Sequence, residues 1–222
     1  MAKALLFDLD GTLVDTAPDL AAALHRLQAE LGQPLTPFEQ LRPLVSQGAR
    51  GMLRGGFGLS PDAPDYAPLA QRFLAHYAQA LCVHSVLFPG MEPLLRTLES
   101  RGIPWGIVTN KVERLARPLI DALGLTARAA CIVGGDTASR AKPHPDPLLH
   151  ACAQAGLQPA HCLYVGDDIR DIQAGRAAGM GTVAAAYGYL GCDDPLAHWN
   201  ADHTIHHPSE LLALIDTDNH KT

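Results

Sequence analysis

Short runs of consecutive apolar residues recur along the chain, and longer stretches with helical spacing separate them. Runs that are apolar at every position are typical of parallel strands that helices cover on both faces. Alternation of such strands with helices predicts an α/β fold, with a Rossmann-like parallel sheet and right-handed connections. The predicted strands occupy residues 5–7, 105–108, 130–133, 162–165 and 182–185.

Helix signals stand between these strands. Residues 93–101 and 169–178 have helical spacing, and Gly179 suits the left-handed position that follows a helix. Asp146 and Pro147 resemble a helix start, in which the aspartate caps the helix and the proline occupies its first position. These signals place helices after several of the predicted strands, as the α/β class requires.

The segment between the first two predicted strands lacks a strand pattern. One helix is expected to begin at a capping box of Thr16 and Asp19, and a second is expected over residues 67–81. Several glycines between them mark loops. We therefore expect an inserted helical domain. The predicted division is an α/β core of residues 1–15 and 87–222, an insert of residues 16–86, and linkers near 15–18 and 86–90.

Composition excludes several classes of protein. Of 222 residues, 47% are hydrophobic and 18% are charged, which is too apolar for a disordered chain. The net charge of −6 carries no basic footprint for nucleic acid. We expect no membrane partner, because no apolar run is long enough to span a bilayer and no secretory signal is visible. Five cysteines without C-x-x-C spacing suggest buried reduced thiols and a cytoplasmic location. We expect a monomer or a homodimer.

Acidic residues gather where predicted strands end. Asp8 and Asp10 follow the first strand, and Asp167 follows the run over 162–165. The carboxyl ends of parallel strands share one edge of the sheet, where ligands bind in such folds. Together in a partly dry site, these carboxylates would repel one another by several kcal/mol on the order of Coulomb energies at intermediate dielectric. A cation must offset that repulsion, and ligands that are all oxygen favour a hard ion, so we expect Mg²⁺.

Further polar groups follow the other strands, and the whole set resembles the haloacid dehalogenase superfamily. Four elements match the order of that family, and each stands at a strand end or in the loop after it. The resemblance covers essentially the whole chain. The elements are Asp-Leu-Asp-Gly-Thr at residues 8–12, Thr-Asn at 109–110, Lys-Pro at 142–143 and Gly-Asp-Asp at 166–168, with Asp171 beyond.

The resemblance implies a phosphoryl-transfer mechanism. Asp8 would be the nucleophile that forms an aspartyl-phosphate, and Asp10 would protonate the leaving alkoxide and then activate water. Asp8, the backbone carbonyl of Asp10, and Asp167 would hold Mg²⁺, which offsets the charge of the nucleophile and of the phosphoryl oxygens. Thr109 would help to bind the phosphoryl group.

Other positions have supporting roles by the same resemblance. Lys142 would neutralise charge on the phosphoryl oxygens, with Lys111 as the competitor for this role. The remaining assignments follow. The backbone amide of Asn110 would bind the phosphoryl group, Gly11 and Thr12 would form the tight turn at the substrate, Asp168 and Asp171 would support the site from behind, and Asp15 would cap the segment that enters the insert.

Two other patterns have plainer explanations. His198, His203, His206 and His207 are close in sequence but fit no zinc template, so we expect them in surface or supporting roles. Tyr187-Gly188-Tyr189 follows the last predicted strand and would either line the outer wall of the site or pack beside it.

The helical insert of this chain resembles the C1-type cap of this family, which closes over the phosphate site and selects the leaving group. Residues 46–50 form our candidate specificity loop, in which Arg50 would pair with a substrate carboxylate and Arg54 is the fallback.

Three branches of the family fit poorly. The insert has no lysine for the Schiff base of phosphonoacetaldehyde hydrolases, and Asp10 is unlike the dehalogenases. Gly166 stands where β-phosphoglucomutases carry glutamate. A phosphomonoesterase acting on a small phosphorylated metabolite remains, similar to phosphoglycolate phosphatases and bacterial N-acetylmuramic acid 6-phosphate phosphatases. The alternatives are a phosphotransferase or phosphomutase acting on a sugar phosphate, and a non-catalytic binding module.

Overall fold

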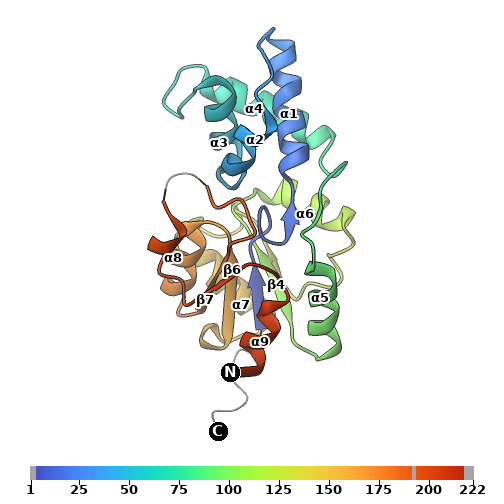
Figure 1. Ribbon diagram of the computed structural model, residues 1–222, viewed down its shortest axis with the longest axis vertical. Helices are drawn as coiled ribbons and strands as arrows, with labels where there is room; N and C mark the ends of the chain where they lie inside the picture. The colour runs from blue at the N-terminus through green and yellow to red at the C-terminus, as the bar shows by residue number, and fades with distance from the viewer. Residues whose placement is uncertain (1–3, 192–193, 218–222) are drawn as a thin grey trace.

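The computed structural model describes residues 4–191 and 194–217. Within them, the central sheet has six strands in the order β5-β4-β1-β6-β7-β8, and every neighbouring pair is parallel (Figure 1). The first strand therefore lies inside the sheet, flanked by the strands that lead into the Thr-Asn and Gly-Asp-Asp elements. The strands are β1 (Ala4–Phe7), β4 (Trp105–Val108), β5 (Ile132–Val133), β6 (Cys162–Gly166), β7 (Gly181–Ala185) and β8 (His203–Ile205).

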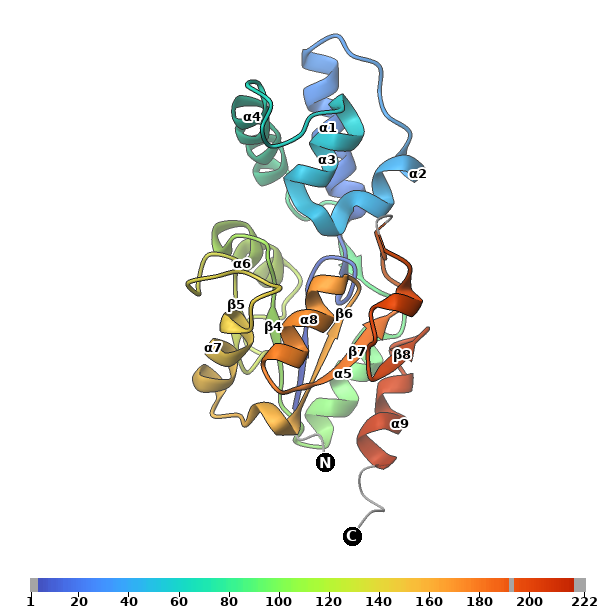
Figure 2. The same cartoon turned by 90° about the vertical axis from the view of Figure 1, so that its left-hand side faces the viewer.

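Helices cover both faces of the sheet (Figure 2). Three of them share one hydrophobic cluster with Leu5 and Phe7, and two share another cluster with Ala4 and Leu6. Consecutive residues of β1 thus pack into opposite layers, which explains why this strand is apolar at every position. On the first face lie α5 (Met91–Ser100), α6 (Glu113–Ala122) and α9 (Glu210–Thr217), and on the second lie α7 (Asp146–Ala155) and α8 (Ile169–Ala177).

A helical region, which we define as the elements from α1 to α4, lies at one end of the sheet (Figure 1). Its residues pack around a hydrophobic cluster that also takes in Leu115 and Tyr189 from the sheet-containing part. Two short strands join the parts as an antiparallel ribbon, β2 (Val14–Asp15) and β3 (Val86–Leu87). The region comprises α1 (Ala17–Glu30), α2 (Phe38–Leu41), the 3-10 helix η1 (Arg42–Gln47), α3 (Gly48–Phe57) and α4 (Tyr66–Gln79).

The predicted α/β class with its parallel sheet is confirmed, and so is the role of Gly179, which follows α8 with a φ of +73°. The capping box at Thr16 is wrong: α1 begins there, but the Thr16 side chain does not cap it. The Asp19 carboxylate instead accepts backbone hydrogen bonds from residues 83–85, which fastens the end of the insert to α1. Asp146 is the first helical residue of α7 rather than its cap.

Strands β2, β3 and β8 escaped the sequence analysis, because each has only two or three residues and too little pattern to detect. Short 3-10 helices, η2 (Pro159–His161) and η3 (Leu196–His198), complete the described elements. Cys192, one of the five cysteines expected as reduced thiols, lies outside the described residues.

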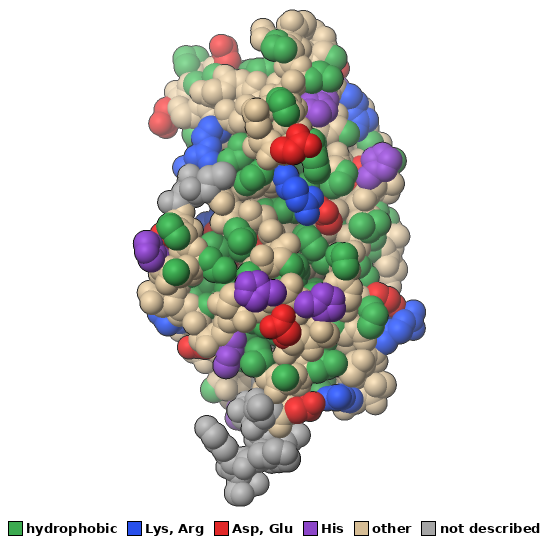
Figure 3. All heavy atoms as spheres, in the orientation of Figure 1, with side chains coloured by type: hydrophobic (Ala, Val, Ile, Leu, Met, Phe, Trp, Pro, Cys, Tyr) green, Lys and Arg blue, Asp and Glu red, His purple; other side chains and the backbone are tan. Residues whose placement is uncertain are grey.

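No helix formed by the described residues has the length and apolar composition to cross a bilayer. On the face shown in Figure 3, acidic and basic side chains are interspersed rather than gathered by sign.

Candidate active site

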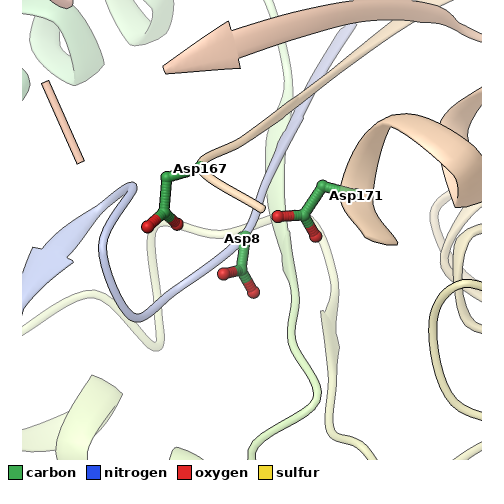
Figure 4. A group of neighbouring side chains, drawn as sticks. All are labelled: Asp8, Asp167 and Asp171. Carbon is green, nitrogen blue, oxygen red and sulfur yellow. The ribbon is translucent and has the colours of Figure 1, made fainter. Parts of the chain in front are cut away.

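Three aspartates meet at the carboxyl edge of the sheet. Asp8 follows β1, Asp167 follows β6, and Asp171 lies in the first turn of α8, and their side chains are neighbours (Figure 4). One carboxylate oxygen from each lies within 4.8 Å of the others, and all three residues are buried. This group, the acid cluster, is the one set of side chains among the described residues that is arranged to hold a metal ion.

Lys142 supplies a positive charge to the acid cluster. Its Nζ donates hydrogen bonds to Asp8 Oδ1 at 2.8 Å and to Asp171 Oδ1 at 2.7 Å. The Tyr164 hydroxyl at 2.7 Å and the Val108 carbonyl at 3.1 Å complete its surroundings. Burial opposes the charge, but the attraction of Asp171 and Asp8 outweighs it and raises the pKa of the Lys142 ammonium. A charged lysine is therefore built into the floor of the site.

The acid cluster still has more negative charge than Lys142 offsets. Burial, followed by repulsion from Asp8 and Asp171, raises the pKa of Asp167 well above its ordinary value. Hydrogen bonds from Tyr189 N and Ser46 Oγ, each 2.9 Å from Asp167 Oδ2, only partly counter this. Three buried carboxylates beside a single ammonium are suited to a divalent cation with oxygen ligands, so these residues fit the predicted Mg²⁺.

Glycines allow the loops to approach the acid cluster closely. Gly11 has a φ of +95°, and a Cβ there would lie 2.1 Å from Asp167 Oδ2. The predicted tight turn is confirmed, but the neighbour that requires glycine is Asp167. At Gly166, a Cβ would lie 2.3 Å from the Asp171 side chain, so a glutamate at this position is incompatible with the present place of Asp171.

Asp10 faces away from the acid cluster. Its Oδ1 accepts hydrogen bonds from Lys111 Nζ at 2.8 Å and from the Thr16 hydroxyl. Lys111 therefore pairs with Asp10 while Lys142 pairs with Asp8, and the two lysines occupy separate positions. The side chain of Asp10 contributes nothing to the acid cluster, where Asp171 takes the third place.

A cavity of about 340 Å³ connects the acid cluster with the helical region. Asp8, Asp10 and Lys142 lie on the side of the sheet. Apolar residues line much of the remaining wall. They are Leu20, Val45, Ala49, Phe73 and Leu74 from the helical region, with Val112 and Leu115 from the segment after β4.

Comparison with known proteins agrees with this geometry. Residues 2–179 match the family model described as "haloacid dehalogenase-like hydrolase". The chain belongs to the haloacid dehalogenase-like hydrolase family. The resemblance inferred from the four sequence elements is thereby confirmed.

Relatives extend over almost the full length of this haloacid dehalogenase-like hydrolase. An N-acetylmuramic acid 6-phosphate phosphatase of Pseudomonas aeruginosa is 45% identical over 214 residues, which cover 96% of this chain and 95% of the relative. A phosphoglycolate phosphatase of Xanthomonas campestris is 48% identical over 210 residues, 94% of each chain. A crystal structure of a predicted phosphoglycolate phosphatase from Haemophilus somnus aligns with a TM-score of 0.84 at 27% identity, covering 96% of this chain and 98% of that one. The similarity to these phosphatases confirms the prediction that the chain is a phosphatase-type enzyme.

Other residues singled out in the sequence of this hydrolase also lie at the site. Thr109 and Asn110 line the cavity. The Asn110 side chain accepts a hydrogen bond from Lys142 N and donates one to Lys142 O, both at 3.0 Å, so it positions the lysine loop. Thr12 Oγ1 donates a hydrogen bond to Asp167 Oδ1 at 2.9 Å.

The two aspartates at positions 168 and 171, after β6, have different roles. Asp168 caps α8 in a capping box with Asp171 and binds Arg170 through both carboxylate oxygens. Arg170 also donates a hydrogen bond to the Ser46 carbonyl at 2.8 Å. Asp171 was expected to support the site from behind, but its carboxylate belongs to the acid cluster itself.

Some predicted residues are not brought to the cavity. Arg50 is exposed on α3 and does not line the cavity, and neither does Arg54. Tyr187 and Tyr189 also lie outside the lining and pack against Phe88, which favours the packing alternative. The histidines at 198, 203, 206 and 207 belong to no metal-binding group among the described residues.

Three further residues were missed or weighed too lightly. Tyr164, inside β6, reads only as an apolar strand residue, although its hydroxyl binds Lys142. Tyr77 lies on a helix face with no distinguishing pattern, yet it lines the cavity. Ser46 did lie in the candidate specificity loop, and its contact with Asp167 is the part of that loop that reaches the acids.

Proposed function

We propose that this hydrolase removes the phosphate group from a small phosphorylated acid, with N-acetylmuramic acid 6-phosphate first and phosphoglycolate second. The observation that carries the proposal is Asp8, held by Lys142 inside a buried acid cluster at the floor of the cavity. The named activities of the two relatives agree with it.

Asp8 is suited to act as the nucleophile. Lys142 holds its Oδ1, whereas its Oδ2 accepts no hydrogen bond from the described residues. In the first step this oxygen attacks phosphorus, the bond from phosphorus to the leaving oxygen breaks, and Asp10 donates a proton to the departing alkoxide. In the second step Asp10 takes a proton from water, which attacks phosphorus and releases Asp8 and inorganic phosphate.

Asp8, Asp167 and the backbone carbonyl of Asp10 would hold Mg²⁺, with Asp171 next to them. Bound there, the ion would offset the negative charge of the nucleophile and of the phosphoryl oxygens. Lys142 adds a fixed positive charge at the same place. Thr109, the amide of Asn110 and the turn at Gly11 and Thr12 would bind the phosphoryl oxygens.

We assign the helical region, within residues 16–86, the role of a cap over the core formed by 1–15 and 87–222. The cap keeps bulk water from the aspartyl-phosphate and shapes the space for the leaving group. Its apolar wall suits the acetyl and lactyl methyl groups of the muramyl sugar, whereas phosphoglycolate has a single methylene group. Leu20, Phe73 and Leu74 form this wall. The wall therefore favours the larger substrate.

Release of inorganic phosphate from both substrates, measured side by side with Mg²⁺, tests the proposal. We expect a higher kcat/KM for N-acetylmuramic acid 6-phosphate. A sugar acceptor added to the assay distinguishes hydrolysis from transfer, because a transferase would yield a new phosphate ester instead of inorganic phosphate. Absence of phosphate release from both acids would overturn the proposal.

We also place the enzyme in the cytoplasm. The four cysteines within the described residues, Cys82, Cys131, Cys152 and Cys162, are unpaired. Such thiols persist in a reducing compartment.

A further inference from the structure

Two polar groups line the cavity together with the apolar wall and with Asp8, Asp10 and Asp171. One is the ammonium of Lys111, from the loop after β4, and the other belongs to Tyr77 of α4. They contact each other, since Lys111 Nζ lies 4.6 Å from the centre of the Tyr77 ring. Residues from the core and from the helical region thus form one polar patch on the cavity wall.

The Tyr77 hydroxyl is buried without a hydrogen-bond partner in the part of the chain that the structure describes. Tyr77 is 1% exposed, and its hydroxyl oxygen has no hydrogen-bond partner among the described residues. A buried hydroxyl without a partner destabilises the folded protein, so such groups usually have a specific explanation. Burial is the main cause that raises the pKa of Tyr77 to about 12, so the group stays protonated and can donate a hydrogen bond.

Lys111 has donors to spare. Its side chain is 8% exposed, and its Nζ donates to Asp10 Oδ1 at 2.8 Å. An ammonium has three N–H donors, so at least one N–H remains beyond those that face Asp10 and the adjoining Tyr77 side chain. Burial opposes the charge, but the attraction of Asp10 outweighs it and raises the pKa of Lys111. The lining of the cavity therefore includes a stable cation.

The other cations near the cavity are committed elsewhere. Lys142 binds two carboxylates of the acid cluster. Arg170 binds Asp168 through two hydrogen bonds and the Ser46 carbonyl through a third. Arg50 is exposed and outside the lining. Lys111 is thus the cation best placed to meet an anionic leaving group.

We propose that Lys111 and Tyr77 together bind the carboxylate of the substrate's leaving group, Lys111 by charge and Tyr77 by a hydrogen bond from its hydroxyl. This assignment rests on the proposed function, because both acids considered there carry a carboxylate beside the phosphate. It makes these two residues, and not Arg50, the determinants of specificity for acids.

The test compares each acid with a phosphate ester that lacks the carboxylate and is neutral at that position. N-acetylmuramic acid 6-phosphate is paired with N-acetylglucosamine 6-phosphate, and phosphoglycolate with 2-hydroxyethyl phosphate. The measured quantity is the ratio of kcat/KM for the acid to kcat/KM for the neutral ester. Any effect of Lys111 on catalysis through Asp10 acts on both members of a pair and cancels in this ratio.

We expect Lys111→Met to lower the ratio about 10- to 100-fold, since it removes a charged hydrogen bond, and Tyr77→Phe to lower it about 2- to 10-fold. Most of the change should appear in KM. Tyr66→Phe, the same substitution on α4 at a residue that does not line the cavity, is the control and should leave the ratio as in the wild type.

The outcomes separate the two proposals. A wild-type enzyme that releases no phosphate from either acid contradicts the proposed function. An active wild type whose ratio is unaffected by Tyr77→Phe and Lys111→Met overturns the assignment of the carboxylate site. If Lys111→Met does not fold, Tyr77→Phe is tested by the same activity ratio and, in addition, by a binding measurement. In that measurement N-acetylmuramic acid, but not N-acetylglucosamine, should raise the melting temperature of the wild type more than that of the variant.

Discussion

Ser46 Oγ donates a hydrogen bond to Asp167 Oδ2 across 2.9 Å, although 121 positions separate the two residues along the chain. Ser46 lies in η1 of the helical region, and Asp167 follows β6 of the sheet. Arg170 strengthens the same junction through the Ser46 carbonyl. The helical region therefore closes directly on a carboxylate of the acid cluster.

Ser46→Ala should loosen this closure. A hydrogen bond of this kind contributes about 0.5–1.5 kcal/mol, so we expect the variant without Mg²⁺ to unfold at lower urea concentration. Limited proteolysis should also cut the ribbon near β3 faster. Ser60→Ala, at an exposed loop position, is the matched control. Equal unfolding midpoints and cleavage rates for wild type and Ser46→Ala would show that the contact does not hold the parts together.

Asp8→Asn should abolish turnover while the protein stays folded. The amide cannot attack phosphorus, and loss of a nucleophile costs at least about 10⁴-fold in kcat. Since the substitution also removes one of three crowded carboxylates, we expect the melting temperature in a chelator to be no lower than that of the wild type. An aryl phosphate assay and a thermal melt measure both. Hydrolysis near the wild-type rate would exclude Asp8 as the nucleophile.

Mg²⁺ should raise the melting temperature of the wild type, because an ion that binds only the folded state stabilises it, by about 2.7 kcal/mol at 100 times the dissociation constant. Asp167→Asn should shrink this shift, and its metal-free form should melt at a higher temperature because repulsion in the acid cluster falls. The control is Asp62→Asn, in an exposed loop. A shift as large in Asp167→Asn as in the wild type would place the ion elsewhere.

Gly166→Ala should disturb the lysine site without removing a charged group. The new Cβ would lie 2.3 Å from Asp171, which would have to move away from Lys142. Overpacking of this kind costs about 1–3 kcal/mol, and kcat should fall with it. In Gly181→Ala the new Cβ would meet the far end of the Leu163 side chain, which can move. We expect a clear difference between these variants in kcat and melting temperature, and equal behaviour would contradict the steric argument.

Much of the site could be predicted because strand ends are local features. The apolar run before Asp8 marks β1, the run before Asp167 marks β6, and parallel strands bring their carboxyl ends together. The lysine at 142 needed the family resemblance, since nothing local distinguishes it from Lys111. The two lysines separate only in space, where Asn110 holds the backbone of Lys142 next to Asp8.

The directions in which side chains point could not be predicted from the sequence. Asp10 turns to Lys111, and Asp171 turns inward because Gly166 leaves it space. Arg50 was expected at the cavity, but α3 presents it to solvent, whereas Ser46 and Tyr77 of the same region reach the site. Which face of a helix meets another part of the molecule depends on the packing of that whole region, and no pattern within one helix specifies it.

The amino-acid sequence by itself determined the fold class, the order of the elements and the chemical groups at the strand ends, because these follow from short-range pattern and residue type. The tertiary structure decided which carboxylates share a centre, which lysine meets which acid, and which residues of the helical region face the cavity. Those relationships join residues far apart in the chain, such as Ser46 with Asp167 and Tyr77 with Lys111, and only packing brings them into contact.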